Sequence, residues 1–177
     1  ISSVVMPSRF RVSLFWDWVS VHRCTWFSAV PTIISYLLGA QEAGSNPENN
    51  VLAHVRFGRS ASAALPPAVH TAFVERFGIP LVETMGITET AAPILSNPLN
   101  PKAHRIGSPG KSCGNEVRIA DERSMDLESG SEGEIQIRGH NVMKGYLKDP
   151  EKTREAFTQD GWYRTGDLGQ MDQDGYV

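Results

Sequence analysis

Three short segments of the sequence combine glycine or very small residues with side chains that carry oxygen atoms. In the first, Thr88 and Glu89 follow shortly after Gly86. Threonine can donate a hydrogen bond to a phosphate oxygen, and one glutamate can ligate Mg²⁺ when phosphates and water fill the other positions. The glycine would let the backbone approach a ligand closely. Taken alone, residues 83–90 equally suit a turn and a helix N-cap with a favourable charge.

The second segment, 162–169, places Asp167 directly after Gly166 at the end of an aromatic run. A carboxylate has two acceptor oxygens, so it can take both hydroxyls of a ribose. The alternative is a β-turn in which Asp167 bonds only to its own backbone. The residues alone leave both interpretations open.

The third segment, Ser60 to Ala64, consists only of serine and alanine. This segment would form a thin wall on which a flat base can lie, because larger side chains would fill that space. A tight strand-to-helix connection without a function is the simpler interpretation of these residues alone. The five histidines are scattered without ligand spacing, and none is assigned a catalytic task.

The elements that must position these segments alternate between strand and helix in the first half of the chain. This pattern predicts an α/β fold with a mainly parallel, doubly wound sheet, in which ligands bind beyond the carboxyl ends of the strands. Thr88 and Glu89 would lie at such an end. The helix over 12–22 is expected to bury Leu14, Phe15, Trp18 and Val19. Strands are expected at 1–6, 24–29, 53–57 and 79–82, and a loop at 44–50. Further helices are expected from Pro31 toward Ala43 and from Pro67 to a cap at Gly78.

After about Asn97 the pattern changes, because glycine and proline recur every few residues and short apolar runs alternate. This predicts an antiparallel β subdomain. Its one helix is expected over 150–157, with Asp149 as the cap. The sequence thus predicts two subdomains, 1–100 and 101–177.

Composition narrows the possible functions. The chain has 177 residues, 40% of them hydrophobic and 21% charged, with a formal net charge of −3. No basic field for nucleic acid is expected, so small-molecule chemistry is favoured. The longest apolar run, 29–38, is too short to span a membrane. The two cysteines, Cys24 and Cys113, lack zinc-site spacing and suggest reduced thiols in the cytoplasm.

Taken in order, these segments resemble the adenylate-forming superfamily of acyl-CoA synthetases, peptide-synthetase adenylation domains and beetle luciferase. Residues 60–65 resemble its adenine loop, 85–89 its Tyr-Gly-x-Thr-Glu motif, 133–147 its Gly-Glu-(Ile/Leu)-x-(Ile/Val)-x-Gly…Gly-Tyr motif, and 163–168 its Tyr-(Arg/Lys)-Thr-Gly-Asp-Leu motif. Segments 25–32 and 105–111 are similar to acyl-CoA and coumarate-CoA ligases. Residues 133–147 are otherwise interpreted as mainly structural.

The resemblance implies an ATP-dependent, AMP-forming acid:CoA ligase, active in the cytoplasm and in fatty acid metabolism, with ATP/AMP, Mg²⁺ and CoA as cofactors. A carboxylic acid would attack the α-phosphorus of ATP, and CoA would then displace AMP. Thr88 would contact the α-phosphate, Glu89 would hold Mg²⁺, and Asp167 would bind the ribose. The residues implied at the adenine are Ser62, Ala63, Glu83, Thr84, Met85 and Gly86. Trp26, Val30 and Ile87 are candidates to border the acyl pocket.

The chain also departs from the family pattern. Met85 stands where an aromatic residue is usual, and Ala61 and Ser62 replace a glycine and a small apolar residue. No segment resembles the phosphate loop, the pocket histidine or the C-terminal lid domain with its lysine. We therefore expect an internal piece of a larger ligase, inactive alone and dependent on the rest of its domain or on another chain. The alternatives are a domain that loads a carrier protein and a non-catalytic nucleotide-binding remnant.

Overall fold

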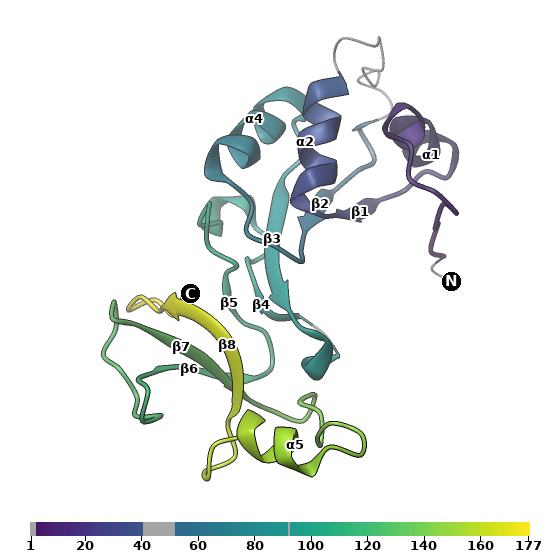
Figure 1. The fold of residues 1–177 in the computed structure, drawn as a ribbon. Helices are drawn as coiled ribbons and strands as arrows, with labels where there is room; N and C mark the ends of the chain where they lie inside the picture. The colour runs from purple at the N-terminus through teal and green to yellow at the C-terminus, as the bar shows by residue number, and fades with distance from the viewer. Residues whose placement is uncertain (1–2, 41–51, 92) are drawn as a thin grey trace. The chain divides into compact units, whose positions relative to one another are not determined.

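The computed structural model describes residues 3–40, 52–91 and 93–177. They fold into two compact units, Ile1–Val82 and Glu83–Val177, which we call the N-terminal unit and the C-terminal unit. Figure 1 follows the chain through both. The change of sequence pattern near residue 100 falls within the C-terminal unit.

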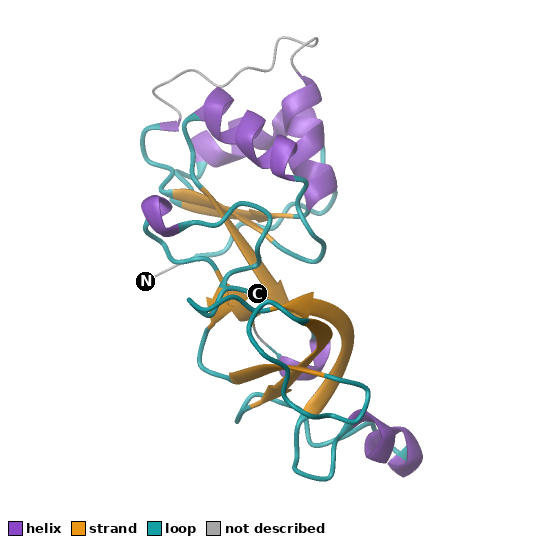
Figure 2. Ribbon diagram, turned by 90° about the vertical axis from the view of Figure 1, so that its left-hand side faces the viewer, coloured by secondary structure: helices purple, strands orange, loops and turns teal. Residues whose placement is uncertain are grey.

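The N-terminal unit combines helices with two parallel strands. Strand β1 pairs with β2 in parallel, and Gly58 N in β2 donates to Pro80 O just before β3 begins (2.8 Å). Helices α2 and α4 lie beside one another on one side of β1 and β2 (Figure 2). In chain order its elements are η1 Val12–Leu14, α1 Phe15–Val21, β1 Trp26–Ala29, α2 Pro31–Gly39, β2 Phe57–Ser60, α4 Pro67–Phe77 and the start of β3 Leu81–Gly86.

Local sequence explains where these helices begin and end. Pro31 and Pro67 each occupy a first helical position, where the missing N–H has no partner to lose. Gly78 ends α4 in the left-handed conformation, with φ 65°. The predicted helix with this glycine cap is therefore confirmed.

Aromatic side chains fill the core of the N-terminal unit. The rings of Phe15 and Phe27 meet edge to face, with centroids 5.2 Å apart, and those of Phe73 and Phe77 are 4.7 Å apart. A Cβ on Gly58 would lie 2.4 Å from Phe27 Cζ. Glycine in β2 thus lets the Phe27 ring lie directly against the strand.

The C-terminal unit is mainly antiparallel. The end of β3 pairs with β4, and β4 pairs with β5, while β6, β7 and β8 form a separate three-stranded sheet. Asp149 caps α5 by accepting from Lys152 N (2.9 Å), as predicted. The remaining elements are η3 Thr88–Thr90, β4 Pro93–Ser96, η4 Pro101–Ala103, β5 Lys111–Ser112, β6 Glu116–Ala120, β7 Glu132–Arg138, α5 Pro150–Ala156 and β8 Tyr163–Gln170.

Cross-strand apolar pairs hold the β6-β7-β8 sheet in register. Val117 lies opposite Ile137, Ile119 opposite Ile135, and Ile137 opposite Tyr163. Ile119, Ile135 and Ile137 are buried together with Ile94 and Leu95. The apolar residues of the alternating sequence pattern therefore form the buried face of this sheet.

The predicted α/β class and the second, antiparallel sheet are confirmed, but several boundaries were wrong. The strand expected at 53–57 lies at 57–60, because pairing with β1 selects a segment whose glycine gives it little β-propensity. The strand expected at 79–82 starts at Leu81 and continues to Gly86. Residues 3–6 form no strand, while the end of the helix expected to reach Ala43 and the loop 44–50 lie outside the described residues.

The buried face of α1 also differs from the prediction. Phe15 and Val19 are buried as expected. Leu14 and Trp18 are only half-buried, and Trp16 is buried instead. The 3₁₀ turn at 12–14 precedes α1 and rotates its face relative to one continuous helix. None of the helices in the described ranges is long and apolar enough to cross a lipid bilayer.

Candidate functional site

The Thr88–Thr90 turn begins directly after β3. Ile87 is extended, and the backbone then tightens into one 3₁₀ turn that ends at Ala91 in the left-handed region, with φ 55°. Thr90 is fully buried, and its hydroxyl donates to Ile87 O (3.0 Å). This inward bond leaves Thr88 exposed and Glu89 half-buried on the outside of the turn.

The segment 139–147, which we call the clamp loop, holds this turn by three hydrogen bonds. Met143 N donates to Glu89 O (2.7 Å), and Asn141 Nδ2 donates to Thr90 O (3.0 Å). The third bond reaches the side chain itself, because Tyr146 Oη donates to Glu89 Oε1 (3.0 Å). Within the described residues, Glu89 Oε2 accepts no hydrogen bond.

A second tyrosine lies beside the first. Tyr163, the first residue of β8, is buried and has its hydroxyl 3.3 Å from that of Tyr146. Burial raises the pKa of Tyr163, and the hydrogen bond to Tyr146 and the nearby charge of Glu89 raise it further. Tyr163 is therefore a neutral phenol at physiological pH.

Helix α5 and the residues before it fix the position of Tyr146. Tyr146 N donates to Thr153 Oγ1 (2.9 Å), and the same hydroxyl donates to Asp149 O (2.7 Å). Lys152 Nζ lies 4.4 Å from the centre of the Tyr146 ring. Gly145 has φ 150°, and a Cβ there would lie 2.6 Å from Thr153 Cγ2, so this position requires glycine.

Asp167 is presented differently. Gly166 adopts φ 75° within β8, and Asp167 N donates to Thr165 Oγ1 (3.0 Å). Thr165 is itself anchored to Ile135 O of β7 (2.7 Å). The exposed Asp167 carboxylate accepts no hydrogen bond from any described residue, so it does not close a turn on its own backbone.

The residues expected at the adenine fall in both units. In the C-terminal unit, Glu83 is buried and accepts from Gly107 N (3.1 Å), whereas Met85 is half-buried and Gly86 exposed. Thr84 is buried. In the N-terminal unit, Ser62 and Ala63 are exposed just after β2, and Ser62 has φ 76°.

The site contains side chains that the sequence alone did not assign to it. Tyr146, Tyr163 and Asn141 were treated as parts of structural motifs. The signal that could have found Tyr146 is its position between a constrained glycine and a helix cap, where an aromatic residue is held rigidly. No periodicity in the sequence pairs it with Glu89, which lies 57 positions away along the chain.

Glu89 suits the Mg²⁺ ion that the family resemblance implies. Among the described residues, no group of three His, Cys, Asp or Glu side chains could hold a metal alone. Mg²⁺ at phosphate sites needs only one or two carboxylates, because substrate oxygens and water complete its shell. One oriented carboxylate with a free oxygen fits that requirement.

Comparison with known proteins decides the family. The model of the family described as AMP-binding enzyme matches residues 2–147. The chain belongs to this family. The resemblance to adenylate-forming enzymes that rests on motifs 60–65, 85–89 and 133–147 is thereby confirmed, while Asp167 lies beyond the matched residues.

Relatives within the family are CoA ligases. The chain is 55% identical over 174 residues to sulfoacetate–CoA ligase of Cupriavidus necator, covering 98% of this chain and 33% of the relative. It is 38% identical over 176 residues to oxalate–CoA ligase of Saccharomyces cerevisiae, covering 99% and 31%. The chain thus spans about a third of the length of these relatives.

Solved structures agree with this placement. The ATP-bound crystal structure of MatB from Rhodopseudomonas palustris is 33% identical, with a TM-score of 0.86. The match covers 97% of this chain and 33% of that protein. The similarity therefore extends over both units.

Proposed function

We propose that the protein to which this chain belongs is an ATP-dependent, AMP-forming acid:CoA ligase. The observation that carries the proposal is the Glu89 carboxylate, held at the end of β3 by Tyr146 with its second oxygen open. Family membership and the CoA-ligase relatives support the same activity. Thr88 and Glu89 also follow the carboxyl end of β3, and open α/β sheets commonly bind ligands beyond the carboxyl ends of their strands.

Different residues of this chain would contact different parts of the nucleotide. Thr88, exposed beside Glu89, would donate to an α-phosphate oxygen, and Asp167 would accept from the ribose hydroxyls. Ser62, Ala63 and the backbone of residues 83–86 would border the adenine. Bound Mg²⁺ would supply charge neutralisation on the phosphates, with Glu89 holding it.

The reaction would proceed in two balanced steps. A carboxylate oxygen of the acid bonds to the α-phosphorus of ATP, and the bond to pyrophosphate breaks. The CoA thiol then loses its proton to solvent, its sulfur bonds to the acyl carbon, and the bond between that carbon and the AMP oxygen breaks. Thr88 would act where negative charge develops on the phosphate, because a fixed donor there stabilises the transition state more than the ground state.

We further propose that the acid is small and carries a second anionic group. The support is that sulfoacetate and oxalate, named for the two relatives above, both have this property. This proposal replaces a fatty acid as the expected substrate. A cytoplasmic location stays a prediction, consistent with two free cysteines.

The test is ATP–pyrophosphate exchange and thioester formation by the full-length protein. The acids would be sulfoacetate, oxalate and malonate, with acetate, octanoate and coumarate as comparisons. We expect exchange with one of the first three and CoA as acceptor. Transfer only to a carrier protein, or AMP binding without exchange, would contradict the proposal.

We also propose that the 177-residue chain alone does not complete the reaction, because it corresponds to about a third of its relatives. The missing contacts would come from the rest of its domain or from another chain. Hydroxamate formation by the purified chain with ATP and Mg²⁺ measures this directly. Turnover that survives removal of contaminating ligases would contradict the expectation.

A further inference from the structure

We propose that Tyr146 is a positioning residue that orients the Glu89 carboxylate for its metal, and that the clamp loop is part of the nucleotide site. The inference rests on the proposed function, in which Glu89 ligates Mg²⁺. It gives a specific task to a segment that the sequence indicated to be mainly structural.

The three bonds of the clamp loop divide into two kinds. The bonds from Met143 N and Asn141 Nδ2 reach backbone oxygens of the turn, so they fix the path of the chain. The bond from Tyr146 Oη reaches Glu89 Oε1 and restricts the carboxylate itself. The terminal torsion of glutamate is otherwise broad, and one donor on Oε1 selects one orientation for Oε2.

The bond to Glu89 also fixes the direction of the contact between the two tyrosine hydroxyls. Tyr146 has a single hydroxyl proton, and donating it to Glu89 leaves only its lone pairs for Tyr163. Tyr163 must then be the donor at the 3.3 Å contact between the two hydroxyls. Tyr163 thus donates to Tyr146, and Tyr146 donates to Glu89. This chain of hydrogen bonds stabilises the negative charge of the carboxylate without neutralising it.

Neutral donors suit a metal ligand better than a cation would. An arginine or lysine on Glu89 would compete with Mg²⁺ for the carboxylate, whereas a phenol orients one oxygen and leaves the negative charge available. The described residues form no ion pair with Glu89. The arrangement therefore matches an outer partner of a metal ligand.

The test compares Tyr146→Phe with wild type in the full-length protein. The substitution removes the hydroxyl and keeps the ring packed against Lys152 and α5. ATP affinity is measured by calorimetry with saturating Mg²⁺ and again with EDTA. We expect the enhancement by Mg²⁺ to fall about tenfold, as for a lost bond to a charged group, with metal-free affinity within about twofold of wild type.

Tyr176→Phe is the matched control, because its hydroxyl donates to Ala103 O (2.6 Å) and has no contact with Glu89. It should leave the Mg²⁺ enhancement unchanged. An equal loss of ATP affinity with and without Mg²⁺ in Tyr146→Phe would show a purely structural role and overturn the inference. So would an Mg²⁺ enhancement equal to that of wild type.

Glu89→Gln separates this inference from the proposed function. If Glu89→Gln loses the Mg²⁺ enhancement while Tyr146→Phe keeps it, Glu89 retains its metal role and Tyr146 is not a positioning residue. If Glu89→Gln keeps the enhancement, the metal role itself fails. In the double variant we expect no loss beyond that of Glu89→Gln, since Tyr146 acts through Glu89, and additive losses would overturn the inference.

Discussion

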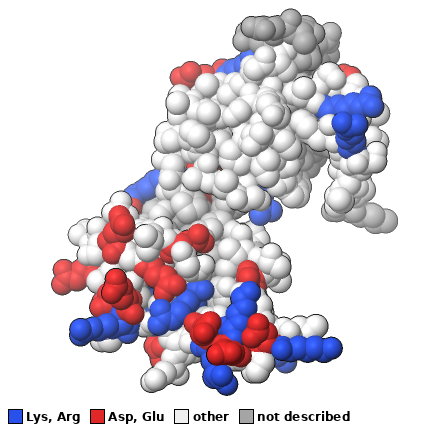
Figure 3. Space-filling model, in the orientation of Figure 1, with Lys and Arg blue, Asp and Glu red and all other residues white. Residues whose placement is uncertain are grey.

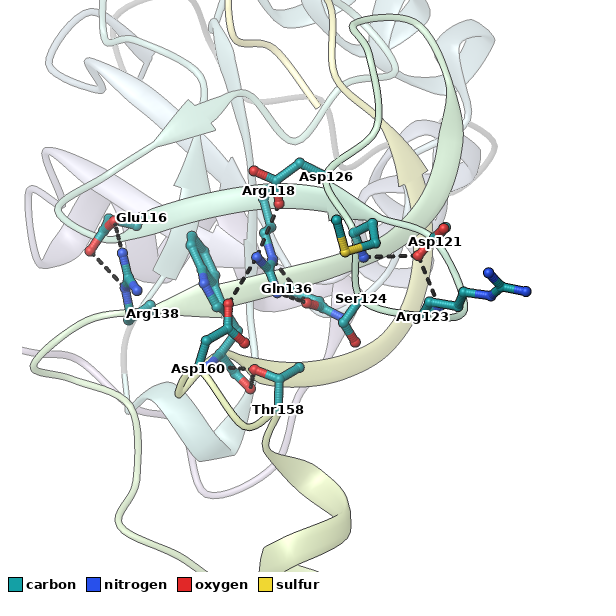
Figure 4. Close-up of polar contacts among 12 residues, drawn as sticks. Glu116, Arg118, Asp121, Arg123, Ser124, Asp126, Gln136, Arg138, Thr158 and Asp160 are labelled. Carbon is teal, nitrogen blue, oxygen red and sulfur yellow. Dashed lines mark hydrogen bonds and ion pairs between the residues drawn. The ribbon is translucent and has the colours of Figure 1, made fainter.

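Carboxylates of the C-terminal unit fall into two groups that differ in their partners. In the first group, acidic side chains in and around the β6-β7-β8 sheet pair with arginines (Figure 4): Glu116 with Arg138 (2.6 Å), and Asp126 and Asp160 both with Arg118 (3.0 and 3.3 Å). Glu89 meets only a neutral hydroxyl, and Asp167 accepts no bond from a described residue. An acidic group paired with arginine is already neutralised, so under the proposed function the carboxylates without a cation are the ones left for ligands.

The arginine-paired region is organised around Trp162. The guanidinium groups of Arg118 and Arg138 lie 4.4 and 4.5 Å from the centre of its ring. Arg118 also donates twice to the buried Gln136 Oε1 (3.0 and 2.9 Å). Figure 3 shows the same mixing of signs over the visible face of the C-terminal unit, where basic and acidic side chains lie next to each other.

The largest expected effect is at Glu89. In the full-length protein, Glu89→Gln should slow adenylation about a hundredfold, ~3 kcal/mol, because a metal-phosphate charge is lost. The fold should remain, because the side chain is half-buried and contributes no core packing. ATP–pyrophosphate exchange at saturating Mg²⁺ measures the loss. Near-normal exchange would show that Glu89 is not part of the site. It would then not differ in role from the carboxylates that pair with arginine.

Asp167→Ala should weaken nucleotide binding by roughly 2 kcal/mol, about thirtyfold in KM for ATP, because bonds from two ribose hydroxyls are lost. The KM for the acid should change little, since the acid carries no diol. Comparison of ATP with 2′-deoxy-ATP tests the contact itself. Wild type should discriminate between the two nucleotides, and equal discrimination by the variant would remove Asp167 from the ribose site.

Gly145→Ala tests the packing between Gly145 and Thr153 that holds Tyr146 in place. The new Cβ would meet Thr153 Cγ2 at 2.6 Å in a backbone conformation that L-residues avoid, so a cost of about 1–3 kcal/mol is expected. Gly161→Ala is the matched control, because Gly161 also has a positive φ, 85°, but open space at its Cβ. Thermal denaturation should show the larger loss for Gly145→Ala. Equal losses would mean that backbone strain alone matters at position 145.

These tests concern residues that the sequence predicted to different degrees. Thr88, Glu89 and Asp167 were named as candidates through short local motifs and a family resemblance, and Asp149 and Gly78 were predicted because caps are local too. Tyr146 was not, since its contact with Glu89 depends on tertiary packing. The position of β2 was missed for the same reason: parallel pairing with β1 outweighs the local preference of Gly58 and Arg59.

The smallest expected effect is at Glu116, the arginine-paired counterpart of Glu89. The hydrogen bond from Arg138 lowers the pKa of Glu116, although the pair is exposed. Its stabilising contribution is therefore present above the unfolded pKa, about 4.3, and is lost as the pH falls through the lower folded value. Because exposed pairs contribute little, Glu116→Gln should lower Tm slightly at pH 7 and leave pyrophosphate exchange within about twofold of wild type.

The pH dependence of the Tm difference shows whether the Glu116–Arg138 pair stabilises the fold at all. The difference in Tm between Glu116→Gln and wild type should shrink as the pH is lowered from 7 toward 3, because protonation removes the same charge in wild type. Added salt should shrink it as well. If Glu116→Gln instead reduced exchange as strongly as Glu89→Gln, arginine pairing would not distinguish structural carboxylates from those that serve the nucleotide.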